Sequence, residues 1–101
     1  MIKHIVFWNL LEEAEGHSKQ ENAMKAKALL EGLLGKIPGL LHIEVGLDFS
    51  DTPDSADIVL YSEFESRTAL NAYHHHPEHQ AVAPFIGKIR CGRRVVDYEI
   101  A

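Results

Sequence analysis

The chain alternates between segments with strand periodicity and segments with helix periodicity, in an order that few folds accommodate. Apolar, β-branched and aromatic residues dominate the strand-like segments, and apolar residues recur every three or four positions in the helix-like ones. The expected strands cover residues 2–10, 40–47, 56–64 and 93–100, and the expected helices cover residues 18–34, 66–76 and 78–86. This β-α-β-β-α-β order predicts an α+β, ferredoxin-like fold with a four-stranded antiparallel sheet.

Capping and breaking residues set the expected helix boundaries. Ser18 is followed three residues later by Glu21, which is the pattern of a capping box at a helix N-terminus. Gly35 follows the last apolar position of this helix and predicts its end. Ser66 is the expected cap of the second helix, and Pro77 is expected to break that helix and to start a further helical piece.

Composition predicts one globular domain covering residues 1–101. The length suits a single domain, and 46% hydrophobic with 25% charged residues is ordinary for a folded protein. Cys91 is the only cysteine, so no intrachain disulfide is expected, which favours a cytoplasmic location. The N-terminal residues have the pattern of a strand rather than of a signal peptide, and no apolar run reaches transmembrane length.

The charge pattern argues against nucleic acid or a membrane surface as partner. The formal net charge is -5, and no stripe of lysines and arginines is present. Arg90, Arg93 and Arg94 form the nearest approach to a basic cluster. We interpret these three residues as solvated charges at the end of a strand.

The first strand predicts self-association. Alternation places Ile2, His4, Val6 and Trp8 on one face of this strand. Two helices cover only one face of the sheet, and the other face is expected to be apolar. Its members would be Ile2, Val6, Trp8, Val59 and Tyr61. Such a patch is larger than most monomers expose, so we expect a homodimer in which two sheets face each other and enclose a cavity.

A run of histidines is the most unusual feature of the sequence. Four of the seven histidines lie between His74 and His79. Adjacent imidazoles on a helix point in different directions and no cysteine completes a ligand set, so no metal site is expected. His74 and His75 are interpreted as solvated residues near a helix C-terminus. His79 follows Pro77, which fixes its direction, and a hydroxyl from Tyr73 is expected to orient it as a general base.

A second group of polar residues is expected in the same cavity. His4 alternates with apolar residues, and Asp57 and Tyr61 on the third strand are expected to face it. A histidine beside a carboxylate is a credible acid–base pair. The alternative is a buried polar network that only stabilises the dimer.

A set of short blocks, in order along the whole chain, resembles the stress-responsive A/B barrel (Dabb) family. The blocks are Ile2-Lys3-His4-Ile5-Val6-Phe7, Ile37-Pro38-Gly39, Glu44-Val45-Gly46, Ser62-Glu63-Phe64-Glu65-Ser66, Ala72-Tyr73, His76-Pro77-Glu78-His79 and Val95-Val96-Asp97-Tyr98. The resemblance implies a ferredoxin-like fold and a homodimeric α+β barrel. Most members of the family are of undetermined function.

The resemblance also implies roles for individual residues. A plant member of the family is a polyketide cyclase that catalyses an intramolecular aldol condensation. Its base and supporting tyrosine match His79 and Tyr73, and its first-strand pocket histidine matches His4. Asp57 stands where that enzyme has a further pocket histidine, and the first helix of this chain contains no tyrosine.

These observations lead to one leading hypothesis. A homodimer binds a small, largely apolar carbonyl compound and abstracts a proton next to the carbonyl, as a cyclase, isomerase or lyase without a cofactor. The catalytic residues would be His79 and Tyr73, and the substrate-binding residues would be His4, Val6, Trp8, Asp57, Val59 and Tyr61. One alternative is a non-catalytic, stress-related structural or assembly protein. Another is a cofactor-free oxygenase that uses Trp8 and Asn9, although strand alternation sends these two side chains to opposite faces.

Overall fold

The computed structural model describes all 101 residues and confirms the predicted order of elements. The elements are β1 (Ile2–Leu10), β2 (Glu13–Ala14), β3 (His17–Ser18), α1 (Lys19–Glu31), β4 (Leu40–Leu47), β5 (Ile58–Phe64), α2 (Arg67–His75), α3 (Pro77–Ile89) and β6 (Arg90–Glu99). The short β2–β3 hairpin was not predicted. It leads the chain from the sheet into α1.

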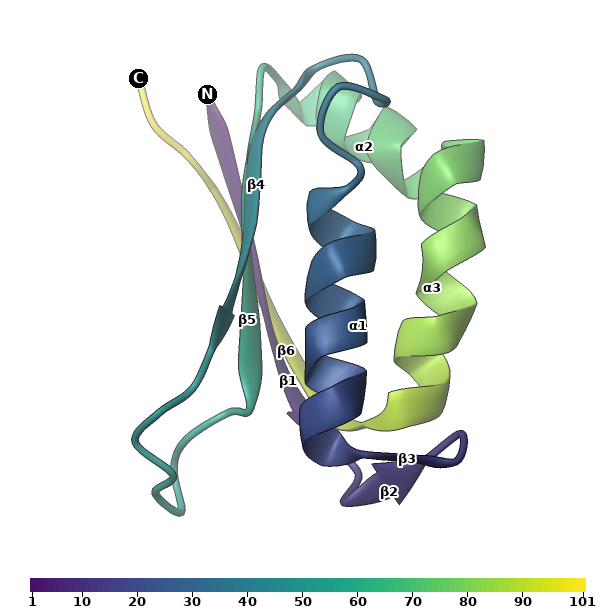
Figure 1. Ribbon diagram of the computed structural model, residues 1–101. Coiled ribbons are helices and arrows are strands. Elements are labelled where there is room, and N and C mark those ends of the chain that lie inside the picture. The colour runs from purple at the N-terminus through teal and green to yellow at the C-terminus, as the bar shows by residue number, and fades with distance from the viewer.

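The four long strands form one antiparallel sheet in the order β4-β5-β1-β6 (Figure 1). Figure 1 also shows that all three helices lie on the same side of this sheet. The molecule therefore has two layers, with one sheet face covered by its own helices and the other face open. None of the helices has both the length and the apolar character that a membrane crossing requires.

The capping residues act as the sequence predicts. Ser18 and Glu21 form a complete capping box at the start of α1, and Ser66 accepts a hydrogen bond from the Ala69 N–H at the start of α2. Helix α1 ends at Glu31, earlier than expected, because Gly32 caps it and the chain then turns. Helix α3 runs past the expected stop at residue 86 and continues to Ile89, so β6 begins immediately afterwards.

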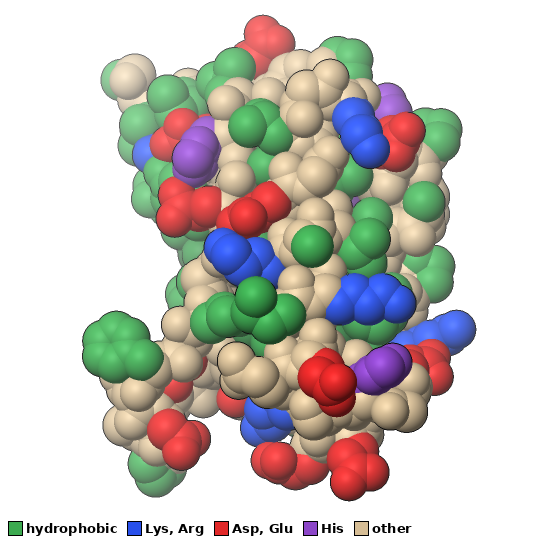
Figure 2. Space-filling view, in the orientation of Figure 1, with side chains coloured by type: hydrophobic (Ala, Val, Ile, Leu, Met, Phe, Trp, Pro, Cys, Tyr) green, Lys and Arg blue, Asp and Glu red, His purple; other side chains and the backbone are tan.

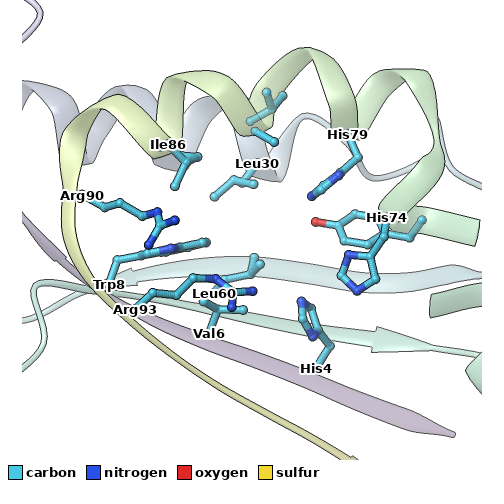
Figure 3. Close-up of a pocket in the computed structure, with 14 residues that line it drawn as sticks. His4, Val6, Trp8, Leu30, Leu60, His74, His79, Ile86, Arg90 and Arg93 are labelled. Carbon is cyan, nitrogen blue, oxygen red and sulfur yellow. The ribbon is translucent and has the colours of Figure 1, made fainter. Parts of the chain in front are cut away.

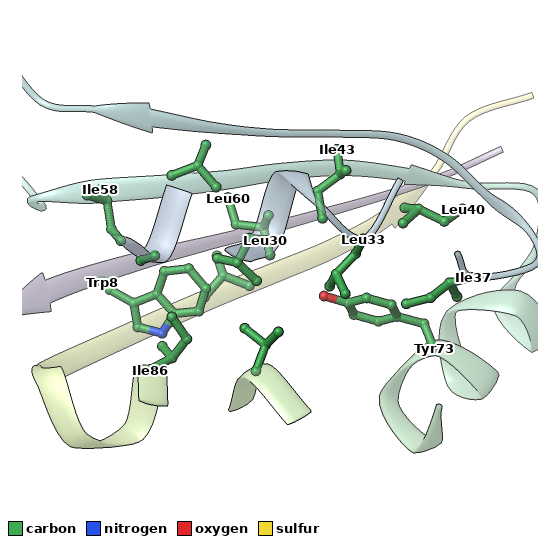
Figure 4. Packing of buried hydrophobic residues seen from close by; sticks show 14 of the residues in the cluster. Trp8, Leu30, Leu33, Ile37, Leu40, Ile43, Ile58, Leu60, Tyr73 and Ile86 are labelled. Carbon is green, nitrogen blue, oxygen red and sulfur yellow. The ribbon is translucent and has the colours of Figure 1, made fainter. Parts of the chain in front are cut away.

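The helix-covered face of β1 is the one that the sequence analysis had assigned to the dimer interface. Ile2, Val6 and Trp8 are buried against the helices, where they join the apolar core (Figure 4). Their partners in register, Phe64, Leu60 and Ile58, lie on the same covered face of β5. The prediction that Ile2, Val6 and Trp8 share a face with Val59 and Tyr61 is therefore wrong.

The open face carries the other set of side chains. Ile5 lies directly opposite Tyr61 on one side and Val96 on the other, and Phe7 lies opposite Val59. Phe7 and Val96 are 40% and 47% exposed, which is high for apolar side chains on a sheet. The expectation of an open, partly apolar sheet face is thus correct, but β1 contributes Ile5 and Phe7 to it rather than Ile2, Val6 and Trp8.

Candidate active site

A pocket of about 190 Å³ lies between the covered sheet face and the helices of the same chain (Figure 3). Its volume lies below the range of about 300–1,000 Å³ that is common for ligand sites, so only a small ligand fits. The pocket is elongated, with histidines gathered at one end and Trp8, Arg90 and Arg93 at the other (Figure 3). We call these the histidine end and the arginine end. His4, Val6 and Trp8, which were expected in a cavity between two sheets, line this cavity inside a single subunit.

Tyr73 and His79 form the histidine end together with two further histidines. Tyr73 lies in the last turns of α2, and His79 lies in the first turn of α3. His76 ends α2 and begins α3, and its Nδ1 accepts a hydrogen bond from the Glu78 N–H. This shared cap places the two rings 4.4 Å apart at their centroids. The Tyr73 hydroxyl makes no hydrogen bond to His79, so ring packing rather than the expected hydroxyl contact orients the imidazole.

His79 is held in its neutral form. Burial lowers the pKa of His79, and the nearby charge of His74 lowers it further. A histidine whose pKa lies below the ordinary value of 6.5 is unprotonated at neutral pH. Its Nδ1 is buried and has no hydrogen-bond partner in the protein. A contact with the His74 backbone raises the pKa in part, but burial is the larger effect. A neutral imidazole of this kind can accept a proton.

Tyr73 has the opposite character. Burial raises the pKa of Tyr73 to about 12, so the phenol keeps its proton at neutral pH. The side chain is almost completely buried, and its hydroxyl points into the interior between the helices and the sheet (Figure 4). No protein group accepts this hydrogen. Tyr73 can therefore donate a hydrogen bond to a ligand oxygen.

His4 reaches the histidine end from the sheet. Its Nδ1 is hydrogen-bonded to the Asp97 carboxylate, which lies directly opposite on β6. The predicted carboxylate partner, Asp57, is elsewhere: it accepts hydrogen bonds from the Leu10 N–H at 2.7 Å and from the Lys19 ammonium at 3.4 Å. The expectation that Asp57 lies beside His4 is wrong, because Asp57 precedes β5 at the far end of the sheet.

His74 is a pocket residue that the sequence analysis interpreted as solvated. Its ring centroid is 5.4 Å from that of His4 and 5.8 Å from that of His79. Burial lowers the pKa of His74, and the charge of His4 lowers it further. His75 points outward, as predicted, with its Nδ1 3.0 Å from the Asn71 carbonyl oxygen. His74 and His75 are adjacent residues at the end of one helix. The sequence therefore did not indicate which of the two imidazoles enters the pocket.

Comparison with known proteins identifies the family. The model of the stress responsive A/B barrel domain (Dabb) matches residues 2–100. The chain belongs to the Dabb family. No curated protein matches the chain.

Solved structures resemble this Dabb domain over nearly its whole length. A dimeric protein of unknown function with a ferredoxin-like fold from Bacteroides fragilis is 34% identical, with a TM-score of 0.84 and coverage of 98% of this chain and 95% of that chain. A dimeric ferredoxin-like protein of unknown function from Jannaschia is 30% identical, with a TM-score of 0.73 and coverage of 98% of both chains. A hydroxynitrile lyase from Passiflora edulis shares the fold at 19% identity, with a TM-score of 0.79 and coverage of 99% and 93%.

Two predicted pocket residues of the Dabb domain, Val59 and Tyr61, lie on the open face instead. The Tyr61 hydroxyl donates a hydrogen bond to Glu63 at 2.6 Å and accepts one from Lys3. Asn9 also points away from the pocket that Trp8 lines, as strand alternation predicts. Nowhere does the fold bring together three or more histidine, cysteine or acidic side chains in an arrangement that could hold a metal ion.

The arginine end was missed by the sequence analysis. Arg90 and Arg93 are exposed to solvent, as predicted for charges at the end of a strand, and they also line the pocket of the Dabb domain. Trp8 lies between these two side chains in Figure 3, and its Nε1 is buried without a hydrogen-bond partner. The available signal was register, since Arg93 lies directly opposite Trp8 and opposite residues share a face.

Proposed function

We propose that this Dabb domain binds a small, largely apolar carbonyl compound in the pocket and removes a proton from the carbon next to the carbonyl. The observation that supports this function is the pairing at the histidine end. A neutral imidazole with an unpartnered nitrogen and a protonated phenol with an unpartnered hydroxyl lie side by side in a partly buried cavity.

The two groups have complementary roles in such a step. The His79 imidazole takes the proton, and the electron pair of the broken C–H bond moves into the carbon–carbon bond of an enolate. The Tyr73 hydroxyl donates a hydrogen bond to the enolate oxygen, where negative charge develops. Return of the proton to another atom gives isomerase chemistry, and bond formation by the enolate carbon gives cyclase chemistry. Lyase chemistry results when the enolate electron pair forms a carbon–carbon double bond and expels a leaving group from the next carbon. No cofactor takes part in these steps.

His4 and His74 complete the polar surface around the carbonyl. Asp97 accepts a hydrogen bond at Nδ1 of His4 and so fixes the orientation of its ring. His74 lies between His4 and His79 and contributes a second neutral imidazole. We assign both residues as polar contacts of the ligand, with Val6 and Trp8 as apolar walls.

Hydrogen–deuterium exchange tests the proposed step directly. 2-Hexanone in deuterated buffer exchanges the hydrogens next to its carbonyl, and proton NMR follows the loss of signal. We expect the domain to accelerate this exchange and His79→Gln to reduce the acceleration by about 10²- to 10⁴-fold, as loss of a general base does. His75→Gln is the matched control, because His75 is a neighbouring exposed histidine.

The same variants test the structural alternative. If His79 only stabilises the domain, His79→Gln lowers the melting temperature by several degrees, as loss of about 1 kcal/mol does in a domain of this size. Unchanged exchange together with such a loss of stability would exclude the catalytic role.

We also propose that the domain is a homodimer formed through its open sheet faces. Partly exposed apolar and aromatic side chains, among them Phe7, Val96 and Tyr98, gather on this face. Phe49 is 97% exposed on the loop between β4 and β5, which projects from the body of the molecule (Figure 2). Patches of this kind mark interaction surfaces, and the Bacteroides fragilis and Jannaschia relatives are dimeric.

Light scattering after size-exclusion chromatography tests this assembly. Phe7→Glu places a charge on the open face and should convert the dimer into a monomer that keeps its fold. Met24→Glu is the control, because Met24 is 50% exposed on the helical side of the molecule. A wild-type protein that elutes as a monomer at micromolar concentrations would contradict the proposal.

A further inference from the structure

The arginine end of the pocket carries positive charge without a protein counterion. Arg90 is the first residue after α3, and Arg93 lies three residues later on β6, directly opposite Trp8. Neither guanidinium forms a hydrogen bond or an ion pair with another residue. Arg67 and four lysines each contact a carboxylate, as Lys3 and Lys27 do at 2.7 Å, whereas Arg94, Lys25 and Lys36 also lack one.

Both side chains are exposed to solvent, so what distinguishes them from other unpaired basic residues is that they line the pocket together. The sequence has 15 acidic residues against 10 lysines and arginines. The pocket itself contains no aspartate or glutamate among the residues that line it. A negative group that enters this end therefore meets two positive charges and no acidic lining residue.

Trp8 supplies a second and independent observation at the same place. The side chain is only 6% exposed, and its Nε1–H is buried without an acceptor. A buried donor that lacks an acceptor costs free energy, and most such groups in proteins have a partner. Figure 3 shows Arg90 and Arg93 beside Trp8, at the opposite end of the pocket from His4 and His79. A ligand oxygen at this end would satisfy the indole N–H.

We propose that the arginine end binds a carboxylate, so that the ligand of this domain is a small oxo acid. Arg90 and Arg93 contact the carboxylate oxygens, since planar guanidinium groups match carboxylate geometry, and the Trp8 Nε1–H donates to one of them. The apolar middle of the pocket, which includes Leu60 and Val82, receives the connecting hydrocarbon chain. The orientation rests on the proposed function, because it places the carbonyl at Tyr73 and His79.

A pair of probes that differ only in the carboxylate tests this inference. 5-Oxohexanoate carries a carbonyl and a carboxylate, whereas 2-hexanone carries the same methyl ketone on a chain of equal length without the charge. NMR titration of the full domain gives the dissociation constant of each probe. We expect 5-oxohexanoate to bind at least about tenfold more tightly, because a charged hydrogen bond supplies the corresponding 1.4 kcal/mol.

Variants locate the effect. Arg90→Gln and Arg93→Gln should each weaken 5-oxohexanoate binding, and the double variant should bind both probes alike, with 2-hexanone unaffected. Lys88→Gln is the matched control, because it removes one positive charge from α3 at a residue outside the pocket. Added salt should weaken binding of the oxo acid and leave binding of the ketone unchanged.

The outcomes separate the two proposals. Equal binding of the two probes by the wild-type domain, or a preference for the oxo acid that survives the double arginine substitution, overturns the carboxylate site and leaves the proposed function standing. Absence of binding by both probes overturns the carbonyl pocket and the carboxylate site together. A preference that Arg90→Gln and Arg93→Gln remove, and Lys88→Gln retains, confirms the inference.

Discussion

The two faces of the sheet use similar residues for different purposes. The covered face of β1 presents His4, Val6 and Trp8 to the helices and forms one wall of a pocket. The open face presents Ile5 and Phe7, together with Tyr61 from the neighbouring strand, and has no helix above it. On the covered side, His4 is hydrogen-bonded to Asp97, but Trp8 Nε1 and His79 Nδ1 lack partners. On the open face, Lys3, Tyr61 and Glu63 satisfy one another. A polar group without a partner inside a cavity thus distinguishes a surface that can bind a ligand from a surface that only combines polar and apolar side chains.

The largest difference between the two faces is expected from removal of one phenylalanine on each. Phe64 is completely buried on the covered face, and Phe64→Ala should lower the free energy of unfolding by about 3–5 kcal/mol. Phe7 is 40% exposed on the open face, so Phe7→Ala should cost less in the isolated subunit and should act mainly on association. Urea unfolding at several protein concentrations separates these effects. Equal losses for both variants at every concentration would remove the distinction.

A smaller but more specific difference is expected from the two tyrosines. Tyr73→Phe removes the hydroxyl at the histidine end and should slow ketone deuterium exchange by about 10²- to 10³-fold, as loss of one oxyanion donor does. Tyr61→Phe removes a hydroxyl from the open face and should leave the exchange rate unchanged. Both variants keep the aromatic ring. If Tyr61→Phe slows exchange as much as Tyr73→Phe does, our proposal that the reaction takes place on the covered face is wrong.

The smallest expected difference is in the pH dependence of stability. The pKa values of His74 and His79 are lowered in the folded protein, so below the ordinary value of 6.5 the unfolded chain binds more protons. The stability that these residues contribute is complete above that pH and is lost as the pH falls through their lowered pKa values. On the open face, hydrogen bonds from Lys3 and Tyr61 lower the pKa of Glu63, so its contribution is lost only below the ordinary value of 4.5.

Urea unfolding as a function of pH, at fixed protein concentration, should therefore show two separate losses of stability. The double variant His74→Gln, His79→Gln should remove much of the first loss, and Glu63→Gln should reduce the second. A first loss of unchanged size in the double histidine variant would show that these imidazoles are not buried in neutral form.

The sequence was sufficient to predict the fold, because strand and helix periodicity, capping serines and Pro77 all agree with it. It was not sufficient to assign the faces of β1, because both sets of alternating residues in that strand are apolar enough to be buried. A finer signal was present. Lys3 and Asn9 alternate with Ile5 and Phe7, which makes this the more polar set and matches it to Val59, Tyr61 and Glu63 on β5.

The candidate site was predicted only where local sequence fixes geometry. Tyr73 and His79 are separated by a short segment with a proline, and the structure places their rings in contact as the motif suggests. Their catalytic roles stay predictions. Arg90 and Arg93 reach the pocket, and Asp97 reaches His4, through the pairing of β1 with β6, which join opposite ends of the chain. Register between distant strands is set by the whole sheet, so no local pattern identified these three residues.

The shared cap at His76 makes the spacing between Tyr73 and His79 intolerant of insertions and deletions. One residue ends α2 and begins α3, so no loop exists that could absorb a change in length. An added residue after His76 would rotate His79 by about 100° around the axis of α3, since an α-helix has about 3.6 residues per turn. Point substitutions in the pocket walls, in contrast, leave the spacing intact. Substitutions in the walls can therefore change which ligand fits, whereas the distance from Tyr73 to His79 is set by a fixed length of chain.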